Sequence, residues 1–259
     1  MENIIWDLRT DNVVSLIKEG KRADGRKLDE YRKIEVVKGI SENADGSAMV
    51  KLGSTGVVAG VKLVPGQPYP DNPDEGTISV GLELLPLADP TYEVGPPRDD
   101  AIEIARVVDR GIRESKAIDF KGLCIREGEL AWIAFVDFYV TNNDGNAFDA
   151  GSIACLAALN ETRFPKLDGD AIVKHEYSGK LKLSKQPLLS TFSKIGGKIV
   201  VDPCLAEEKA QEARFSCAVA DDKALCAFQK GEGGSFKASE IDECIELAFK
   251  HAKEIRKLV

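Results

Sequence analysis

The segment from Asn142 to Asn160, NNDGNAFDAGSIACLAALN, is the part of the chain whose residue types most clearly permit chemistry. A polar turn leads into an apolar helix through Asp149, Gly151 and Ser152. The first backbone N–H groups of a helix have no partner within the helix, and a glycine and a serine there would let an oxyanion approach them. The segment therefore predicts an anion site, although the same pattern is typical of an ordinary helix N-cap.

The residues before this helix predict the element that holds it. Leu130 to Val140 is a run of apolar, β-branched and aromatic residues, as in a buried strand. The NNDG sequence that follows is a tight-turn sequence that could return the chain antiparallel to that strand. A strand, a turn and a helix start of the type DAGS are therefore expected to follow one another.

This strand, turn and DAGS-type helix start resemble the core of the RNase PH family, and the resemblance extends from about Arg22 to the C-terminal helix. Active members bind inorganic phosphate at this helix and use it to shorten RNA from the 3′ end. The resemblance implies an α/β (α+β) fold with duplicated βαβα halves, mixed sheets and packed helices. Within the family, the chain is most similar to the RNase PH-like subunit of the archaeal exosome that does not carry the catalytic site.

Two departures from the active pattern concern the binding of phosphate. In active relatives an arginine that binds phosphate follows the DAG[ST] motif, whereas this chain has Ile153. Isoleucine has neither a charge nor a donor, so the charge-assisted part of a phosphate site is absent. Active relatives also carry two adjacent arginines before a helix, where this chain has Asp99 and Asp100. Two carboxylates would repel an RNA phosphate, although they also suit the positive end of a helix.

The acidic strand of the active site is retained only in part. Active relatives carry an aspartate, a second aspartate six residues later and a further one beyond, where this chain has Asp202, Glu208 and Arg214. Asp202 and Glu208 would then be remnants of a catalytic site or part of an interface. Phosphorolysis depends on positioning phosphate and stabilising charge, so a chain without the phosphate-binding arginines is expected to have lost phosphorolytic activity. No catalytic residue, metal site or cofactor is therefore assigned.

The composition favours a globular chain whose contacts with nucleic acid must be local. The net charge of −8 repels phosphate at a distance. Six cysteines without a CxxC pair are expected to be small buried residues, and His175 and His251 do not lie in a ligand-spaced cluster. Since no apolar run is long enough to cross a membrane and the first residues do not resemble a signal peptide, a cytoplasmic protein is expected.

The segment from Asp99 to Ser115 predicts a helix with two stripes of different character. Arg106, Arg110 and Arg113 recur at i, i+4 and i+7 and form a basic stripe. They would either pair with acidic residues of the same helix or present a basic face to RNA phosphates. The resemblance favours RNA, because the corresponding region of the exosome subunit borders the RNA path. The apolar stripe consists of Ala101, Ile104, Ala105, Val108 and Ile112.

Three segments are expected along the chain. Residues 1–26 form an N-terminal helix and a connecting loop, 27–187 a first RNase PH-like domain, and 188–259 a second such domain with the C-terminal helix. The RADGR sequence at 22–26 is expected to be mainly a structural turn, with direct RNA contact as the alternative. The proline-rich stretch at 65–76 resists both a helix and a central strand and is expected to be an exposed loop.

These observations predict an accessory subunit. It would pair with a catalytic RNase PH-like exosome subunit in a ring of three of each, a trimer of dimers. There it would bind RNA and support 3′-to-5′ phosphorolysis and the reverse, polyadenylation-type reaction. An RNA-binding cap protein is a further candidate partner, and no membrane is expected. Two alternatives remain open. The chain is itself a phosphate-dependent 3′-5′ exoribonuclease that uses Ser152 and Asp202, or it is a purely structural ring member without RNA contact.

Overall fold

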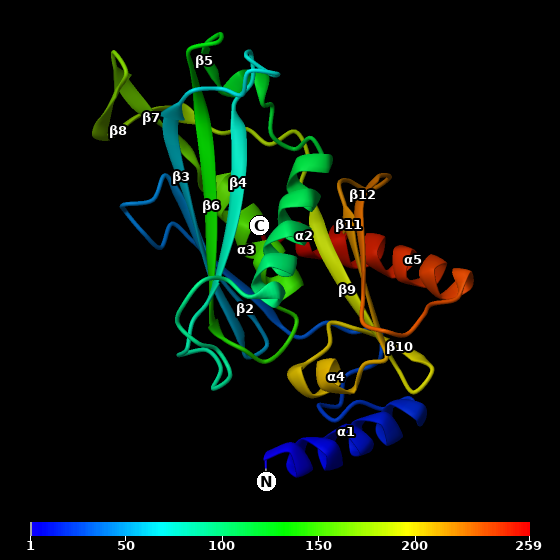
Figure 1. The fold of residues 1–259 in the computed structure, drawn as a ribbon. Coiled ribbons are helices and arrows are strands. Elements are labelled where there is room, and N and C mark those ends of the chain that lie inside the picture. The colour runs from blue at the N-terminus through cyan, green and yellow to red at the C-terminus, as the bar shows by residue number, and fades with distance from the viewer. Residues whose placement is uncertain (1) are drawn as a thin grey trace.

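The larger of two principal sheets forms one side of the molecule (Figure 1). A computed structural model describes the backbone of residues 2–259 and the side chains of residues 8–259. The strand order is β1-β2-β3-β6-β4, with β5 beside the start of β6, and β4 is parallel to β6 whereas the other pairs are antiparallel. The strands are β1 (Ile34–Lys38), β2 (Gly46–Leu52), β3 (Thr55–Gly66), β4 (Thr77–Leu84), β5 (Cys124–Arg126) and β6 (Leu130–Asn142).

The second principal sheet is antiparallel and has the order β10-β9-β11-β12. Its strands are β9 (Leu188–Ile195), β10 (Lys198–Val201), β11 (Ala213–Val219) and β12 (Leu225–Gly231). A separate ribbon of β7 (Arg163–Asp168) and β8 (Ala171–Lys180) projects from the body of the molecule (Figure 1). The helices are α1 (Glu2–Lys18), α2 (Asp99–Glu114), η1 (Lys121–Leu123), α3 (Ala147–Glu161), α4 (Leu205–Ala210) and α5 (Ala238–Ile255).

Helix α3 lies between the two sheets, where it contacts β2, β3 and β9. Every residue from Ala147 to Leu159 is buried, because a helix that is apolar on all sides must be covered on all sides. Strand β6 alternates, with Phe138 fully buried and Phe135 exposed on the opposite face. The first sheet thus packs one face on α3, and its outer face is open within the described residues.

Helix α2 begins at Asp99 and ends one residue before the predicted end at Ser115. The whole predicted apolar stripe is buried. It packs between β4 of the larger sheet and β12 of the smaller sheet (Figure 1). The periodicity of the sequence therefore predicted this helix and its buried face correctly.

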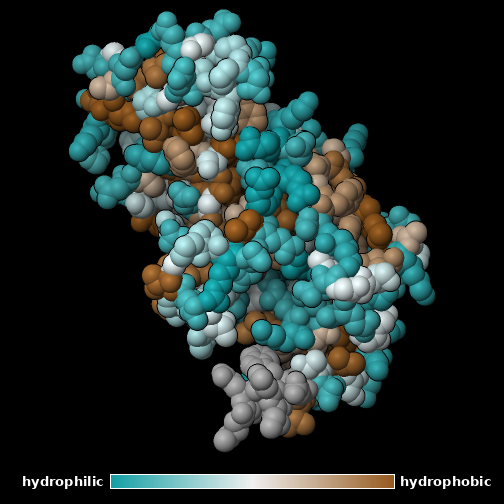
Figure 2. Space-filling model, in the orientation of Figure 1, coloured by the Kyte–Doolittle hydropathy of each residue, from teal (hydrophilic) through white to brown (hydrophobic). Residues whose placement is uncertain are grey.

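The predicted α/β (α+β) architecture, with a sheet and packed helices in each half, is confirmed. The turn after β6 does not return the chain as an antiparallel strand, because it leads directly into α3. The proline-rich stretch at 65–76 is a loop only from residue 67, because Pro65 and Gly66 are the last residues of β3. The loop at 67–76 is exposed or half-buried except for Pro68, which is buried. On the face shown in Figure 2, polar residues predominate and apolar residues gather over the upper part of the larger sheet. Among the helices described, none is long and apolar enough to cross a membrane.

Candidate functional site

Helix α3 starts at Ala147 rather than at the predicted Asp149-to-Ser152 junction, so the expectation that Gly151 and Ser152 open the helix is wrong. Asn146 is the N-cap, with a φ of 58°, and its side-chain oxygen accepts a hydrogen bond from the backbone N–H of Asp149 at 3.3 Å. The Asn-x-x-Asp pattern thus provides a hydrogen-bond partner for a free backbone N–H group at the helix start, four residues before the predicted Gly-Ser start. Gly151 and Ser152 therefore lie beyond the first turn, without an exposed helix end to offer an anion.

Both residues are instead used for packing. A Cβ atom on Gly151 would lie 2.5 Å from the Cε2 atom of Phe138, so the glycine allows the helix to approach that ring. The Oγ atom of Ser152 accepts a hydrogen bond from the backbone N–H of Leu189 at 3.1 Å, which ties α3 to β9. Ile153, at the position of the arginine of active relatives, is fully buried in the core.

Asp149 is fully buried and joins α3 to β9 and to the N-terminal loop. Its carboxylate accepts hydrogen bonds from the Tyr31 hydroxyl at 2.7 Å and from the Thr191 hydroxyl at 2.8 Å. Burial raises the pKa of Asp149 to about 6, against the opposing effect of these bonds and of one from Asn146. The first acidic residue of the DAGS segment is thus part of the interior.

Asp202 is fully buried as well, with a φ of 50°. It forms ion pairs with Arg26 at 2.9 Å and Arg32 at 2.7 Å and accepts a hydrogen bond from the side chain of Asn146 at 2.8 Å. These four residues are called the Asp202 cluster. They connect the N-terminal loop, the start of α3 and the end of β10. Asp202 therefore has a structural role, because its carboxylate is paired with two arginines of this chain.

The RADGR loop supplies two arginines to the interior, which confirms the prediction of a structural turn. The Arg22 side chain is fully buried and pairs with Glu207 at 2.6 Å, and it donates to the backbone oxygens of Val201 and Asp202. The Arg26 side chain is 10% exposed. Little of either guanidinium remains for contact with RNA.

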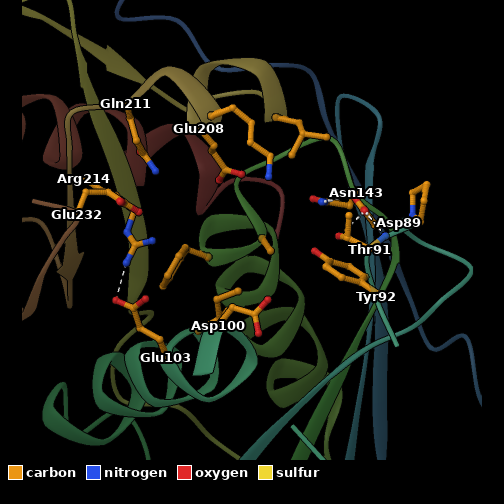
Figure 3. A pocket seen from close by; sticks show the side chains of 16 residues that line it. Asp89, Thr91, Tyr92, Asp100, Glu103, Asn143, Glu208, Gln211, Arg214 and Glu232 are labelled. Carbon is orange, nitrogen blue, oxygen red and sulfur yellow. Dashed lines mark hydrogen bonds and ion pairs between the residues drawn. The ribbon is translucent and has the colours of Figure 1, made fainter. Parts of the chain in front are cut away.

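A cavity of about 560 Å³ lies beside the Asp202 cluster, at the junction of α2, α3 and α4 (Figure 3). Of the residues predicted for an altered active site, Asp100 and Glu208 line it, and so does Arg214. The cavity has five acidic and two basic residues in its walls, which makes it a negative environment. We call it the acidic cavity. These charged residues are Asp89, Asp100, Glu103, Glu208, Glu232, Lys209 and Arg214.

Arg214 is already engaged within the acidic cavity. Its Nη2 atom lies 2.5 Å from the Oε1 atom of Glu103 (Figure 3). Its guanidinium lies 4.3 Å from the centre of the Phe148 ring. The Glu208 carboxylate accepts a hydrogen bond from the backbone N–H of Asn146 at 2.7 Å, and burial raises the pKa of Glu208 to about 7. One acidic residue therefore occupies the N-terminal end of α3, and another neutralises the arginine.

Asp99 does not line the cavity, although Asp100 beside it does. Both lie exposed in the first turn of α2, where the helix dipole stabilises negative charge. Ser152, Ile153 and Asp202 are buried outside the walls of the cavity. Among the described residues, no group of three or more His, Cys, Asp or Glu side chains could hold a metal ion, and all six cysteines are free.

The three arginines of α2 do not form one continuous basic face. Arg110 turns toward β12, where it donates to the side chain of Gln229 at 2.9 Å. Arg113 pairs with Asp109 at 2.9 Å. Arg106 is exposed, and no residue in the described part of the chain forms an ion pair or a hydrogen bond with its side chain. The three arginines do recur along α2 as predicted, but the orientation of the Arg110 and Arg113 side chains depends on the strands that pack against this helix.

The Asp202 cluster was not found from the sequence, because Arg32 and Asp202 are 170 residues apart and no local pattern pairs them. The cap at Asn146 did have a signal, since Asn-x-x-Asp before an apolar run is typical of a helix start.

Comparison with known proteins gives consistent results over nearly the whole chain. Residues 30–165 match domain 1 of the 3′ exoribonuclease family, RNase PH, and residues 185–251 match domain 2. The exosome complex component Rrp42 of Methanopyrus kandleri is 46% identical over 99% of this chain and 97% of its own length. The protein of the same name from Thermococcus gammatolerans is 45% identical over 99% of this chain and 95% of its own.

Solved structures agree with these matches. A chain of the Archaeoglobus fulgidus exosome with RNA bound to the active site superposes with a TM-score of 0.91 at 41% identity, covering 98% of both chains. A chain of an archaeal exosome core superposes with a TM-score of 0.87 at 38% identity, covering 99% of this chain and 98% of the other.

Proposed function

Because the chain belongs to the 3′ exoribonuclease (RNase PH) family, we propose that it is a non-catalytic subunit of an archaeal-type exosome ring. Two kinds of relative support membership of the ring. Proteins of similar length at 45–46% identity are named exosome complex component Rrp42, and the two superposed structures are exosomes. The first of those exosomes contains RNA at its active site. In this proposal, the chain acts on RNA together with a second, catalytic subunit.

The observation that carries the non-catalytic part of the proposal is the charge of the acidic cavity. Arg214, the one arginine among the described residues that line it, is held by Glu103, and Asp100 and Glu208 add further carboxyl groups. Phosphorolysis requires positive charge that positions inorganic phosphate and stabilises the charge of the transition state. A cavity with this lining repels phosphate and RNA alike.

The partner in this proposal is a catalytic RNase PH-like subunit, and three copies of each alternate in a trimer of dimers. The chain completes the RNA-binding surface and stabilises the active site of its neighbour, in both phosphorolysis and the polyadenylation-type reverse reaction. A cap protein is a further proposed partner, and the complex is proposed to be cytoplasmic. The proposed units of the chain are 1–26, 27–187 and 188–259. Assembly is tested by native mass spectrometry of the two purified subunits mixed in equal amounts. A species with three copies of each is expected, and failure to associate would remove the proposal.

The alternative that the chain is itself a phosphorolytic enzyme receives no support from the proposed catalytic groups. The Ser152 hydroxyl accepts a hydrogen bond from Leu189, and the Asp202 carboxylate is fully buried between two arginines. Neither group reaches the acidic cavity. A nucleophile, acid or base must be within hydrogen-bond reach of the substrate, so these two residues are poorly placed for chemistry.

The RNA-binding role of Arg106, Arg110 and Arg113 is tested by reversing all three charges to glutamate in the assembled ring. Weaker RNA binding with a flatter dependence on salt is expected, because fewer counterions are released from the RNA. RNA affinity is measured by fluorescence anisotropy over a series of salt concentrations.

A matched control changes the same amount of charge on α5 and the residues after it, with glutamate at the exposed residues Lys250, Lys253 and Lys257. If the arginine variant and the control bind RNA with the same affinity and salt slope, α2 has no part in RNA binding. RNA crosslinks confined to the partner would then favour a purely structural ring member.

A further inference from the structure

The open outer face of the larger sheet has an acidic residue at its centre. On β6, Phe135, Asp137 and Tyr139 alternate with buried residues and therefore point to this face. Strand β6 lies between β3 and β4, so Asp137 is in the interior of the sheet rather than at an edge. An aspartate is uncommon in such a position, because strands favour β-branched and aromatic residues.

The residues beside Asp137 on both neighbouring strands are glycines. Gly60 of β3 and Gly81 of β4 are its partners in the register. A Cβ atom on Gly81 would lie 2.4 Å from the Oδ1 atom of Asp137, so the carboxylate leans over this glycine. A Cβ atom on Gly60 would meet nothing within 4 Å, so the other side is open. We call this gap around the carboxylate the Asp137 notch.

The charge of the notch has no partner in the chain. Within the described residues, Asp137 forms neither a hydrogen bond nor an ion pair. Partial burial and the negative charge of Glu83, on the same face of β4, raise the pKa of the Asp137 carboxyl. Lys62, which lies on this face of β3, pairs with Asp45 at 3.2 Å instead. The notch is therefore a partly buried negative site without a cation.

Apolar side chains surround the notch. Phe135 and Val64 are 38% and 37% exposed. The register of β3 and β6 places Val58, Ile133 and Tyr139 on the same face, where they are half-buried. An apolar surface with an unpaired charge at its centre is typical of a protein-protein contact in which the partner supplies the opposite charge.

The charge of the notch decides between possible occupants. RNA is disfavoured, because Asp137 and Glu83 repel phosphate. A second copy of this chain is disfavoured too, since a two-fold contact through this face would bring two unpaired carboxylates together. The face fits a protein that offers apolar side chains around a lysine or an arginine.

Resting on the proposed function, we propose that this face binds the catalytic subunit of the ring and that a lysine or arginine of that subunit enters the Asp137 notch. The two glycines leave room for the aliphatic part of such a side chain, and its charged group binds the carboxylate. Assembly then pairs a charge that is unpaired in the isolated chain. The same charge favours the mixed pair over a pair of identical chains, as alternation in the ring requires.

The test measures the association of the two purified subunits by isothermal titration calorimetry. Asp137→Asn keeps the shape of the notch but removes its charge, and it is expected to weaken association roughly thirtyfold to a few thousandfold. Gly60→Val keeps the charge but fills the open side of the notch, and it is expected to weaken association as well. Asp242→Asn is the matched control, at an exposed residue of α5 that has no partner in the described chain, and is expected to bind like the wild type.

Both notch variants are expected to fold, because Asp137 has no hydrogen bond to lose and valine is favoured in strands. Thermal unfolding of the isolated chain checks this. The occupant is identified by photo-crosslinking from p-benzoylphenylalanine introduced in place of Phe135, in assembled rings that contain RNA. Crosslinks to the catalytic subunit are expected. The proposal is overturned if Asp137→Asn associates like the wild type, or if the crosslinks go to RNA or to another copy of this chain.

The result also separates this surface from the proposed function. If the wild-type subunits assemble and Asp137→Asn does so with the same affinity, the surface is wrong and the ring role stands. If the wild-type subunits do not associate, both are wrong.

Discussion

Replacing Asp202 by alanine is expected to destabilise the whole chain, because this carboxylate holds two arginines in the interior. Its oxygens accept hydrogen bonds from Arg26 Nη1, from the backbone N–H, Nε and Nη2 of Arg32, and from Asn146 Nδ2, at 2.7–2.9 Å. Burial opposes the charge of Arg32, but the bonds and charge of Asp202 more than offset this and raise the pKa of that guanidinium. Alanine would leave the Arg32 guanidinium without its main partner and would remove one of the two carboxylates that pair with Arg26, the other being Asp24.

The size of the effect follows from the burial of the cluster. Asp202 is fully buried, and the Arg26 and Arg32 side chains are 10% and 7% exposed. Removing one partner of a buried ion pair costs about 3–5 kcal/mol. Since 1 kcal/mol shifts the unfolding midpoint of a chain of this size by about 2–4 °C, the expected decrease is about 6–20 °C.

The assay is thermal unfolding of the purified chain, followed by circular dichroism. Asp222→Ala is the control, because that aspartate pairs with Arg256 at the surface and its side chain is 68% exposed. The control is expected to change stability by less than about 1 kcal/mol. If Asp202→Ala unfolds at the temperature of the control, the structural role of Asp202 is refuted. If it unfolds earlier, loss of activity in this variant cannot be read as loss of catalysis.

Three further substitutions test the site and its packing. Glu208→Gln is expected to leave stability unchanged near pH 4 and to increase it by about 1–3 kcal/mol at pH 8. The pKa of Glu208 is raised to about 7 in the folded state, so its ionised form destabilises the fold as the pH rises above the ordinary pKa of a glutamate. Urea unfolding at both pH values measures this, and a difference that does not depend on pH would contradict it. Ile153→Arg is expected to destabilise by about 3 kcal/mol or more and to bind no phosphate in calorimetry, because the position is fully buried; phosphate binding by a folded variant would be the opposite result. Gly151→Ala is expected to lose about 1–3 kcal/mol in urea unfolding, since its Cβ would lie 2.5 Å from the buried Phe138 ring, and wild-type stability would show that this contact can relax.

Elements with a clear periodicity were predictable from the sequence. The stripe at 3.6-residue spacing in α2 reflects a buried face, and the structure has it. The apolar run of β6 predicted a buried strand, and the structure has the strand but exposes Phe135 on its outer face. The consistently apolar α3 was also recognisable, because both sheets cover it. Local patterns are informative where a single element meets one continuous core.

The functional positions were harder to predict, since they depend on contacts between distant segments. The DAGS segment is a helix interior because Asn146 caps α3 earlier, and Ile153 belongs to the core rather than to an altered phosphate site. The spacing of the arginines did not predict where the Arg110 side chain points, because it turns toward Gln229 on β12 and donates a hydrogen bond to it. Asp202 reads as a catalytic remnant in sequence, but two arginines from the N-terminal loop surround it.

The central claim, that the chain supports catalysis without performing it, is tested most directly by the release of nucleoside diphosphate. The purified chain, alone and then with its catalytic homologue, is incubated with 3′-tailed RNA, Mg²⁺ and inorganic phosphate. Release is expected from the mixture and at a higher rate than from the homologue alone, with none from the chain by itself. Phosphate-dependent release by the isolated chain, abolished by Glu208→Gln, would contradict the account and identify the acidic cavity as an active site.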